Sequence, residues 1–268
     1  MKKHTIIIFL LIILSSCNRE FVQVFDTNST NTQLKDNYFI YETDSVKITY
    51  NFWSNKGVMS FAVYNKLDKP IYIDWKNSSF IYNDNKLNYW VEETESSNYS
   101  KYYGKYYYNG PLLKPGVTSD GETYSNTHTI KPERITFIPP KSNYYRSQFL
   151  LLPIDYFEFS NYDSSIVSRN DKPKKQTTIY YKNYLYNNSP LRFRNYLAIT
   201  LSENSQKFIF IDNEFYINSV KEIDKRHFNG KKIGNNQDYY YENPFKRATL
   251  FYILTPKYKS IEEKNKFE

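Results

Sequence analysis

The chain has 268 residues, a formal net charge of +8 and a single cysteine. One cysteine excludes a disulfide framework, and basic residues that are spread along the chain rather than clustered argue against a nucleic-acid partner. The length suffices for one large domain or two small ones.

The first 16 residues are typical of an export signal. A basic start, Met1-Lys2-Lys3-His4, precedes an apolar run from Ile6 to Leu14 that is less than half of the roughly 20 residues needed to span a bilayer. The sequence Leu14-Ser15-Ser16-Cys17, which follows, resembles the lipobox of bacterial lipoproteins. That resemblance implies cleavage before Cys17 and attachment of lipid to its thiol.

With its one thiol consumed by lipid, the mature protein is expected to be anchored to a membrane and not to span it. We expect it in the bacterial cell envelope, lipid-anchored to the outer membrane at the periplasmic face or at the cell surface. Residues 17–37 are polar, with Thr27-Asn28-Ser29-Thr30-Asn31-Thr32 at their centre, and are predicted to form a flexible tether. Residues 38–256 are then the folded domain.

The stretch from Val46 to Asn83 predicts several strands in succession. Apolar and polar residues alternate in three runs that are separated by turn residues, and a short apolar strand follows them. We expect the apolar members of these runs to form the core. They are Val46, Ile48, Tyr50, Phe52, Met59, Phe61, Val63, Ile71, Ile73 and Trp75.

The rest of the chain predicts further short strands, interrupted by two long breaks. The first break contains a tyrosine-rich insertion at residues 99–110, and the second spans about 160–175. No segment of ten or more residues has a helical period, and residues 257–268 are predicted to be a frayed, charged end. The clearest strand places five apolar residues on one face: Leu191, Phe193, Leu197, Ile199 and Leu201.

Many short strands, regular turns and no crossover helices predict an all-β fold, an antiparallel β-sandwich with long tyrosine-rich loop insertions. Several blocks of the chain resemble those of a family of uncharacterised Bacteroidota lipoproteins with an immunoglobulin-like sandwich. The blocks lie at residues 61–65, 70–75, 78–81, 137–142, 190–196 and 213–216. That resemblance implies an immunoglobulin-like fold and an export route, and it implies no activity.

The sequence offers no catalytic set, metal site or cofactor motif. Outside the signal only His128 and His227 remain, and neither lies at a recognised spacing from a second metal-type ligand. A pair of carboxylates such as Asp155 and Glu158 could serve a glycosidase, but nothing marks these acids as buried. We therefore expect no enzyme, no metal and no cofactor. The other candidate acids are Glu92, Glu95, Asp120 and Glu122.

Aromatic residues in loops are the remaining candidates for binding. Their rings can stack on the apolar faces of sugars while tyrosine hydroxyl groups bond to the sugar edges. A biased composition, rich in Lys, Asn, Ile and Tyr together, is the simpler explanation of their abundance. The candidate ligand-binding residues are Trp90, Tyr102, Tyr103, Tyr106, Tyr107, Tyr108, Tyr239 and Tyr240.

Two functions are compatible with this sequence. The first is a lipid-anchored, non-catalytic envelope lipoprotein that acts as an interaction or structural module, with an envelope protein as its partner. The second is a glycan-binding lipoprotein that uses the tyrosine-rich loops. An exposed row of two or three aromatic rings beside a groove would favour the second function, and buried or scattered tyrosines would favour the first.

Overall fold

The computed structural model describes residues 20–90, 133–203, 205, 207–235, 238–256 and 259–265. Within these ranges the chain forms two antiparallel sheets that pack against each other through one shared apolar core. The all-β antiparallel sandwich predicted from the sequence is confirmed.

The larger sheet has ten strands in the described part of the chain, and β14 is the longest of them. Its main path runs through β11 (Asp163–Ser168), β12 (Gln176–Asn183), β14 (Ile209–Asp224), β13 (Arg192–Thr200), β6 (Ile71–Asp74) and β9 (Ile135–Ile138). Beside this path, β1 (Phe21–Ser29) pairs with β14 and β17 (Leu250–Thr255), and β7 (Ser79–Tyr82) pairs with β13 and β8 (Asn85–Asn88).

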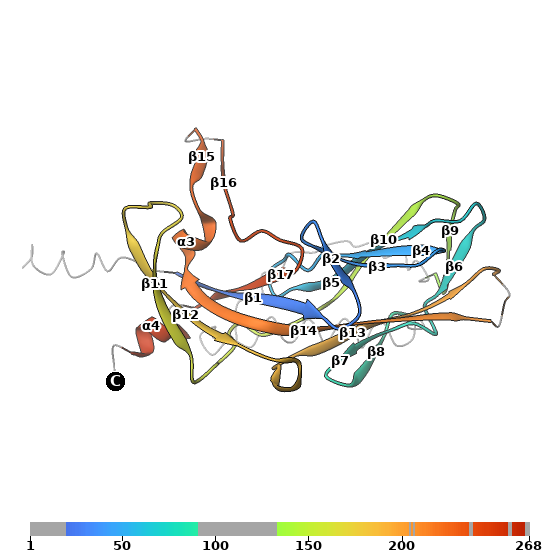
Figure 1. Cartoon of the computed structure of the whole chain (residues 1–268), viewed down its shortest axis with the longest axis horizontal. Coiled ribbons are helices and arrows are strands. Elements are labelled where there is room, and N and C mark those ends of the chain that lie inside the picture. Colours follow the sequence, from blue (N-terminus) through green and yellow to red (C-terminus); the bar gives the residue numbers. More distant parts are fainter. Residues whose placement is uncertain are drawn as a thin grey trace, which may run out of the picture.

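The smaller sheet covers one end of the larger sheet, and in Figure 1 it lies above the right-hand half of β13 and β14. Its strand order is β10 (Asn143–Leu150), β5 (Val58–Asn65), β4 (Val46–Tyr50), β3 (Tyr38–Glu42) and β2 (Gln33–Lys35). A separate hairpin is formed by β15 (Lys232–Gly234) and β16 (Tyr239–Tyr241). The short helical elements are η1 (Tyr186–Asn188), α3 (Lys225–Asn229) and α4 (Ile261–Lys264). No helix among the described residues is long and apolar enough to cross a lipid bilayer.

The alternating residues of the opening stretch form the core between the sheets, as predicted. All ten apolar residues named above for that stretch are buried. The indole of Trp75 also satisfies its polar atom, because its Nε1–H donates to Thr136 Oγ1 at 2.7 Å. In the strand predicted at 191–201, four of the five apolar residues are buried, but Leu201 is exposed because it follows the end of β13.

A buried polar network crosses this core. Asn195 of β13 donates through Nδ2 to the Tyr50 hydroxyl (3.0 Å) and accepts at Oδ1 from the Tyr89 hydroxyl (2.8 Å). The Tyr50 hydroxyl in turn donates to Asn213 Oδ1 at 2.8 Å. Burial raises the pKa of both Tyr50 and Tyr89, so both stay neutral. These bonds pair most of the polar groups that the two sheets bury here, although Asn213 Nδ2 makes no hydrogen bond to the described residues.

The flexible tether predicted for residues 17–37 is wrong from Phe21 onward, because Phe21–Ser29 form the inner strand β1. Phe25 packs in the core between the sheets, while Val22 and Val24 pack in a second apolar cluster on the opposite face of the larger sheet. The polar residues that suggested a tether bond to neighbouring strands instead. Thr27 Oγ1, for example, donates to the Thr249 carbonyl at 2.6 Å. Residues 17–19 lie outside the described ranges.

The frayed end predicted for residues 257–268 is also wrong in its described part. Ile261 of α4 is buried, and its N–H donates to Glu222 Oε1 at 2.6 Å. The break predicted at 160–175 contains the edge strand β11, whose largely exposed side chains give it little apolar alternation. The folded domain therefore extends beyond residues 38–256 in both directions.

Candidate functional site

The predicted site residues do not converge. Cys17 and the five tyrosines between Tyr102 and Tyr108 lie outside the described residues. Trp90 is partly buried against the core, with Lys76 Nζ 5.9 Å from its ring centroid. Tyr239 and Tyr240 belong to the hairpin strand β16. In Figure 1 this hairpin projects above the left-hand part of the molecule, whereas β8, which ends two residues before Trp90, lies along its lower edge.

The hairpin tyrosines are exposed, but they do not form a flat platform. Tyr239 and Tyr241 meet edge to face, with ring centroids 5.7 Å apart and an interplanar angle of 81°. Tyr240 is 65% exposed and pairs with Ile233. Its side chain lies on the face of the hairpin opposite to that of Tyr239 and Tyr241. Rings that are perpendicular or on opposite sides cannot stack together on one sugar.

The predicted acids and histidine serve structural contacts where the structure describes them. Asp155 pairs with Lys56 at 2.7 Å and Glu158 pairs with Lys264 at 2.8 Å, both at the surface. His227 is buried, and its Nδ1 accepts the backbone N–H of Asn170 at 3.1 Å. Burial lowers the pKa of His227, so the imidazole is neutral at pH 7. The remaining candidates, His128, Glu92, Glu95, Asp120 and Glu122, lie outside the described ranges.

A different site lies on the outer face of the larger sheet, away from the core. Here β7, β13 and β14 form the floor of a groove of about 430 Å³. The register of the strands brings its residues together, since Ser79 lies opposite Tyr196 and Tyr196 lies opposite Asp212. The groove is lined by Asn77, Ser79, Ile81, Asp84, Lys86, Arg194, Tyr196 and Asp212.

Three aromatic rings form a row at one end of this groove. Phe210 stacks on Tyr196 with ring centroids 5.4 Å apart and an interplanar angle of 22°. Phe208 continues the row, 5.7 Å from Phe210 at 33°. Phe210 is 54% exposed and pairs with Ala198 on the neighbouring strand. The small Ala198 side chain leaves room above the sheet for the Phe210 ring. Tyr196 and Phe208 are partly buried, so Phe210 is the ring of this row that is most open to solvent.

Charged side chains lie beside the aromatic row. Arg194 Nη1 bonds to Asp212 Oδ2 at 2.7 Å, while Asp212 Oδ1 is buried and accepts no hydrogen bond from the described residues. Burial raises the pKa of Asp212, although the nearby Arg194 opposes this change. Arg194 carries five N–H donors and both side chains are 36% exposed, so both retain hydrogen-bonding capacity toward a ligand, Asp212 through Oδ2.

A tight turn places two further charges on the wall of the groove. Asn83 and Asp84 connect β7 to β8 with φ values of 43° and 66°, as a two-residue hairpin turn requires. Asp84 and Lys86 then border the groove, and Asp84 pairs with Arg192 at 3.3 Å. The wall is thus held by a short hairpin rather than by a long loop.

The sequence-based predictions missed this groove because they placed the candidate binding residues in loops. The signal that could have identified it is two runs in which every second residue is aromatic or charged, Arg194-x-Tyr196 and Phe208-x-Phe210-x-Asp212. Outward-facing residues that alternate aromatic and charged on paired strands indicate a surface with more than a solubilising role. Whether such residues lie side by side depends on the register between the strands, and the local sequence does not specify that register.

Comparison with known proteins adds no family: no family model, curated protein or solved structure matches this chain. Among the described residues no three His, Cys, Asp or Glu side chains gather as a metal site would require. The chemistry of the groove therefore rests on its own geometry. It offers ring stacking at one end and hydrogen bonds from charged and amide groups along its floor and wall.

Proposed function

We propose that this chain is a lipid-anchored, non-catalytic, carbohydrate-binding lipoprotein of the bacterial envelope. The groove on β7, β13 and β14 is the proposed carbohydrate site. The observation that carries this proposal is the row of Phe208, Phe210 and Tyr196, with Phe210 exposed, beside a groove with hydrogen-bonding side chains. The site differs from the tyrosine-rich loops that the sequence suggested.

The groove matches the two kinds of surface that a sugar presents. The C–H faces of a pyranose are apolar and pack on aromatic rings such as Tyr196. Its hydroxyl groups both donate and accept, so they are matched by the Arg194 guanidinium and the Asp212 carboxylate, which offer donors and acceptors side by side. Because the groove is open along the sheet, it fits a segment of polysaccharide better than a single enclosed sugar.

The N-terminal sequence supports an anchored domain. The signal-like segment and lipobox-like Leu14-Ser15-Ser16-Cys17 support acylation of Cys17. β1 begins only four residues later, at Phe21. Four residues reach at most about 14 Å, so lipid on Cys17 would hold the folded domain close to the bilayer.

Binding can be tested on the full chain in detergent with insoluble cellulose, chitin, xylan and peptidoglycan. We expect retention on at least one of these, and the double change Tyr196→Ala with Phe210→Ala should weaken it at least about fivefold, because ring stacking contributes about 0.5–1.5 kcal/mol per ring. The matched control is Tyr145→Ala, since Tyr145 is 73% exposed on β10 of the other sheet. Retention on none of the four would favour the protein-interaction module instead.

Anchoring is tested separately by Cys17→Ala. Intact-mass measurement should find acyl chains on the unaltered mature protein and an unprocessed, unacylated precursor for the variant. Identical processing of both proteins would contradict the lipoprotein assignment.

A further inference from the structure

The exposed hairpin β15–β16 lies at the end of the domain where the N-terminal segment leaves it. The Lys225 N–H donates to the Glu20 carbonyl at 2.8 Å, and Lys225 Nζ pairs with Glu20 Oε2 at 2.5 Å. Lys225 is the first residue of α3, and the hairpin follows α3 after two further residues. Figure 1 shows the hairpin projecting away from the sheets at the end where β1 begins.

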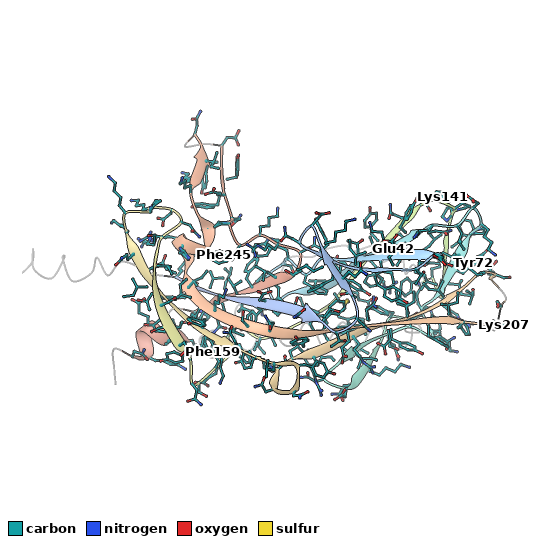
Figure 2. All side chains as sticks on the ribbon, in the orientation of Figure 1. Glu42, Tyr72, Lys141, Phe159, Lys207 and Phe245 are labelled. Atoms are coloured by element: carbon teal, nitrogen blue, oxygen red, sulfur yellow. The ribbon has the colours of Figure 1, made fainter. Side chains whose placement is uncertain are left out.

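Both faces of this hairpin expose large side chains. Tyr239 is 49% exposed, Tyr240 is 65% exposed, and Ile233 is 40% exposed. Lys232 Nζ lies 3.7 Å from the ring centroid of Tyr239. Figure 2 shows the hairpin side chains directed outward, whereas Phe245, just beyond the hairpin, lies against the body of the domain. The hairpin therefore buries little of its own apolar surface within this chain.

The segment that carries the hairpin is also basic. Residues 225–247 contain six Lys and Arg residues and two acids, Asp238 and Glu242, which gives a formal charge of +4. The six basic residues are Lys225, Arg226, Lys231, Lys232, Lys246 and Arg247. A surface that combines exposed tyrosines with an excess of lysine complements an anionic lipid headgroup layer, where tyrosine is favoured and each basic residue is attracted.

We propose that hairpin β15–β16 is a second membrane contact, which docks at the headgroup region of an anionic bilayer beside the lipid on Cys17. This inference rests on the lipid anchor of the proposed function. Glu20 lies three positions after Cys17 in the chain, a reach of at most about 10 Å. Since Glu20 is bound to the start of α3, the acyl chains would hold the base of the hairpin near the bilayer surface.

Two contacts would orient the domain, whereas one lipid would leave it free to rotate. In Figure 1 the hairpin projects upward at the left, whereas β7 and β8 lie below β13, on the opposite side of the long sheet. Docking of the hairpin would therefore direct the proposed carbohydrate groove away from the lipid surface.

A single engineered cysteine can test this contact on the full lipidated chain. Acylation consumes the thiol of Cys17, the one cysteine in the sequence, so Tyr240→Cys supplies the one reactive thiol for an environment-sensitive fluorophore. In vesicles of phosphatidylcholine with phosphatidylglycerol, we expect blue-shifted emission and quenching by headgroup nitroxides. The control label at Tyr145→Cys, also highly exposed, should remain in water and be quenched by iodide.

Two variants separate the hairpin contact from the anchor. Lys231→Glu with Lys232→Glu should remove most of the blue shift at position 240, and so should vesicles without phosphatidylglycerol. Gly234→Ala should act similarly, because a Cβ at Gly234 would lie 2.3 Å from the Asp238 carbonyl oxygen and the hairpin would have to distort. Equal iodide quenching at positions 240 and 145 would overturn the proposal.

Intact mass shows whether the anchor itself is present. If Cys17 carries no acyl chain, the anchor has failed, and sedimentation of the unlabelled chain with the same anionic vesicles tests the hairpin alone. Co-sedimentation that is lost in Lys231→Glu with Lys232→Glu would uphold the hairpin contact, and its absence in the unaltered chain would refute it.

Discussion

Strands β13 and β14 present two aromatic surfaces that differ in what surrounds each ring. On the inner face, Phe215 is fully buried and meets rings from both sheets. On the outer face of the same strand, Phe210 is 54% exposed and meets Tyr196 and Phe208 from its own sheet. The inner rings therefore hold the sheets together, and the outer rings are available to a ligand. The rings around Phe215 are Phe39, Tyr50, Phe52 and Phe193.

Polar groups follow the same division. On the inner face, Asn195 makes hydrogen bonds to two tyrosine hydroxyl groups and is completely buried. On the outer face, Arg194 and Asp212 bond to each other, both side chains stay 36% exposed, and Asp212 Oδ1 accepts no hydrogen bond from the described residues. Most inward polar groups are therefore matched within the protein, with buried Asn213 Nδ2 as an exception among the described residues, whereas outward groups are only partly matched.

The largest test of this comparison is Phe215→Ala against Phe210→Ala. Loss of a buried phenylalanine costs about 3–5 kcal/mol, and we expect Phe215→Ala near the upper end because four rings lose a neighbour. Phe210→Ala, on the same strand, should cost no more than about 1 kcal/mol. Urea unfolding monitored by circular dichroism measures both. Equal losses would show that the outer row is structural.

Phe25→Ala tests the strand that the sequence suggested was a tether. The Phe25 ring is buried and stacks on Phe251 with centroids 4.7 Å apart, so we expect a loss of roughly 3–4 kcal/mol in the free energy of unfolding. Leu34→Ala is the control, because Leu34 is 66% exposed on β2, and its effect should stay within about 0.5 kcal/mol. A mobile N-terminal segment would make the two variants indistinguishable.

Glu222 predicts a pH dependence of stability. Burial raises its pKa to about 7, although the Ile261 N–H and the Gln23 amide donate to its carboxylate. Between the unfolded value of 4.5 and about 7 the folded state binds the extra proton, so stability falls as pH rises through this window. The contribution, on the order of 3 kcal/mol, is fully present below pH 4.5.

Glu222→Gln isolates this contribution from other titrating groups. The slope of unfolding free energy against pH between 4.5 and 7 should be less negative in the variant than in the unaltered chain, because glutamine does not ionise. Parallel pH profiles for the two proteins would count against the raised pKa of Glu222.

The smallest of these effects concerns the inner polar network. Asn195→Ala removes one partner from each of two buried tyrosine hydroxyl groups, Tyr50 and Tyr89. An unpaired buried polar group costs about 1–3 kcal/mol, and we expect a loss of about 2 kcal/mol in urea unfolding. Asn143→Ala, at the exposed start of β10, should be close to neutral. A neutral Asn195→Ala would mean that the tyrosines find other partners.

Local alternation predicted the centre of this molecule well. The runs around Val46, Phe61 and Ile71 have the period of two that places every second residue in the core. The same rule failed at β1, where residues on both faces are apolar because two clusters cover the strand. It also failed at Ile261, because a single short helix has no period to detect.

The sequence by itself determined the antiparallel sandwich, because strand period, turn residues and the absence of long helical periods are local properties. Only the tertiary structure decided which outward residues meet. One register shift shows why: β14 contains an extra residue, Asn218, opposite the junction of Asp26 and Thr27. Ile217 and Val220 therefore both enter the main core, and alternation alone would have placed them on opposite faces. Strand register likewise placed Tyr196 opposite Asp212 and built the groove, since pairing between distant segments is selected by packing over the whole sheet and not by neighbours in the chain.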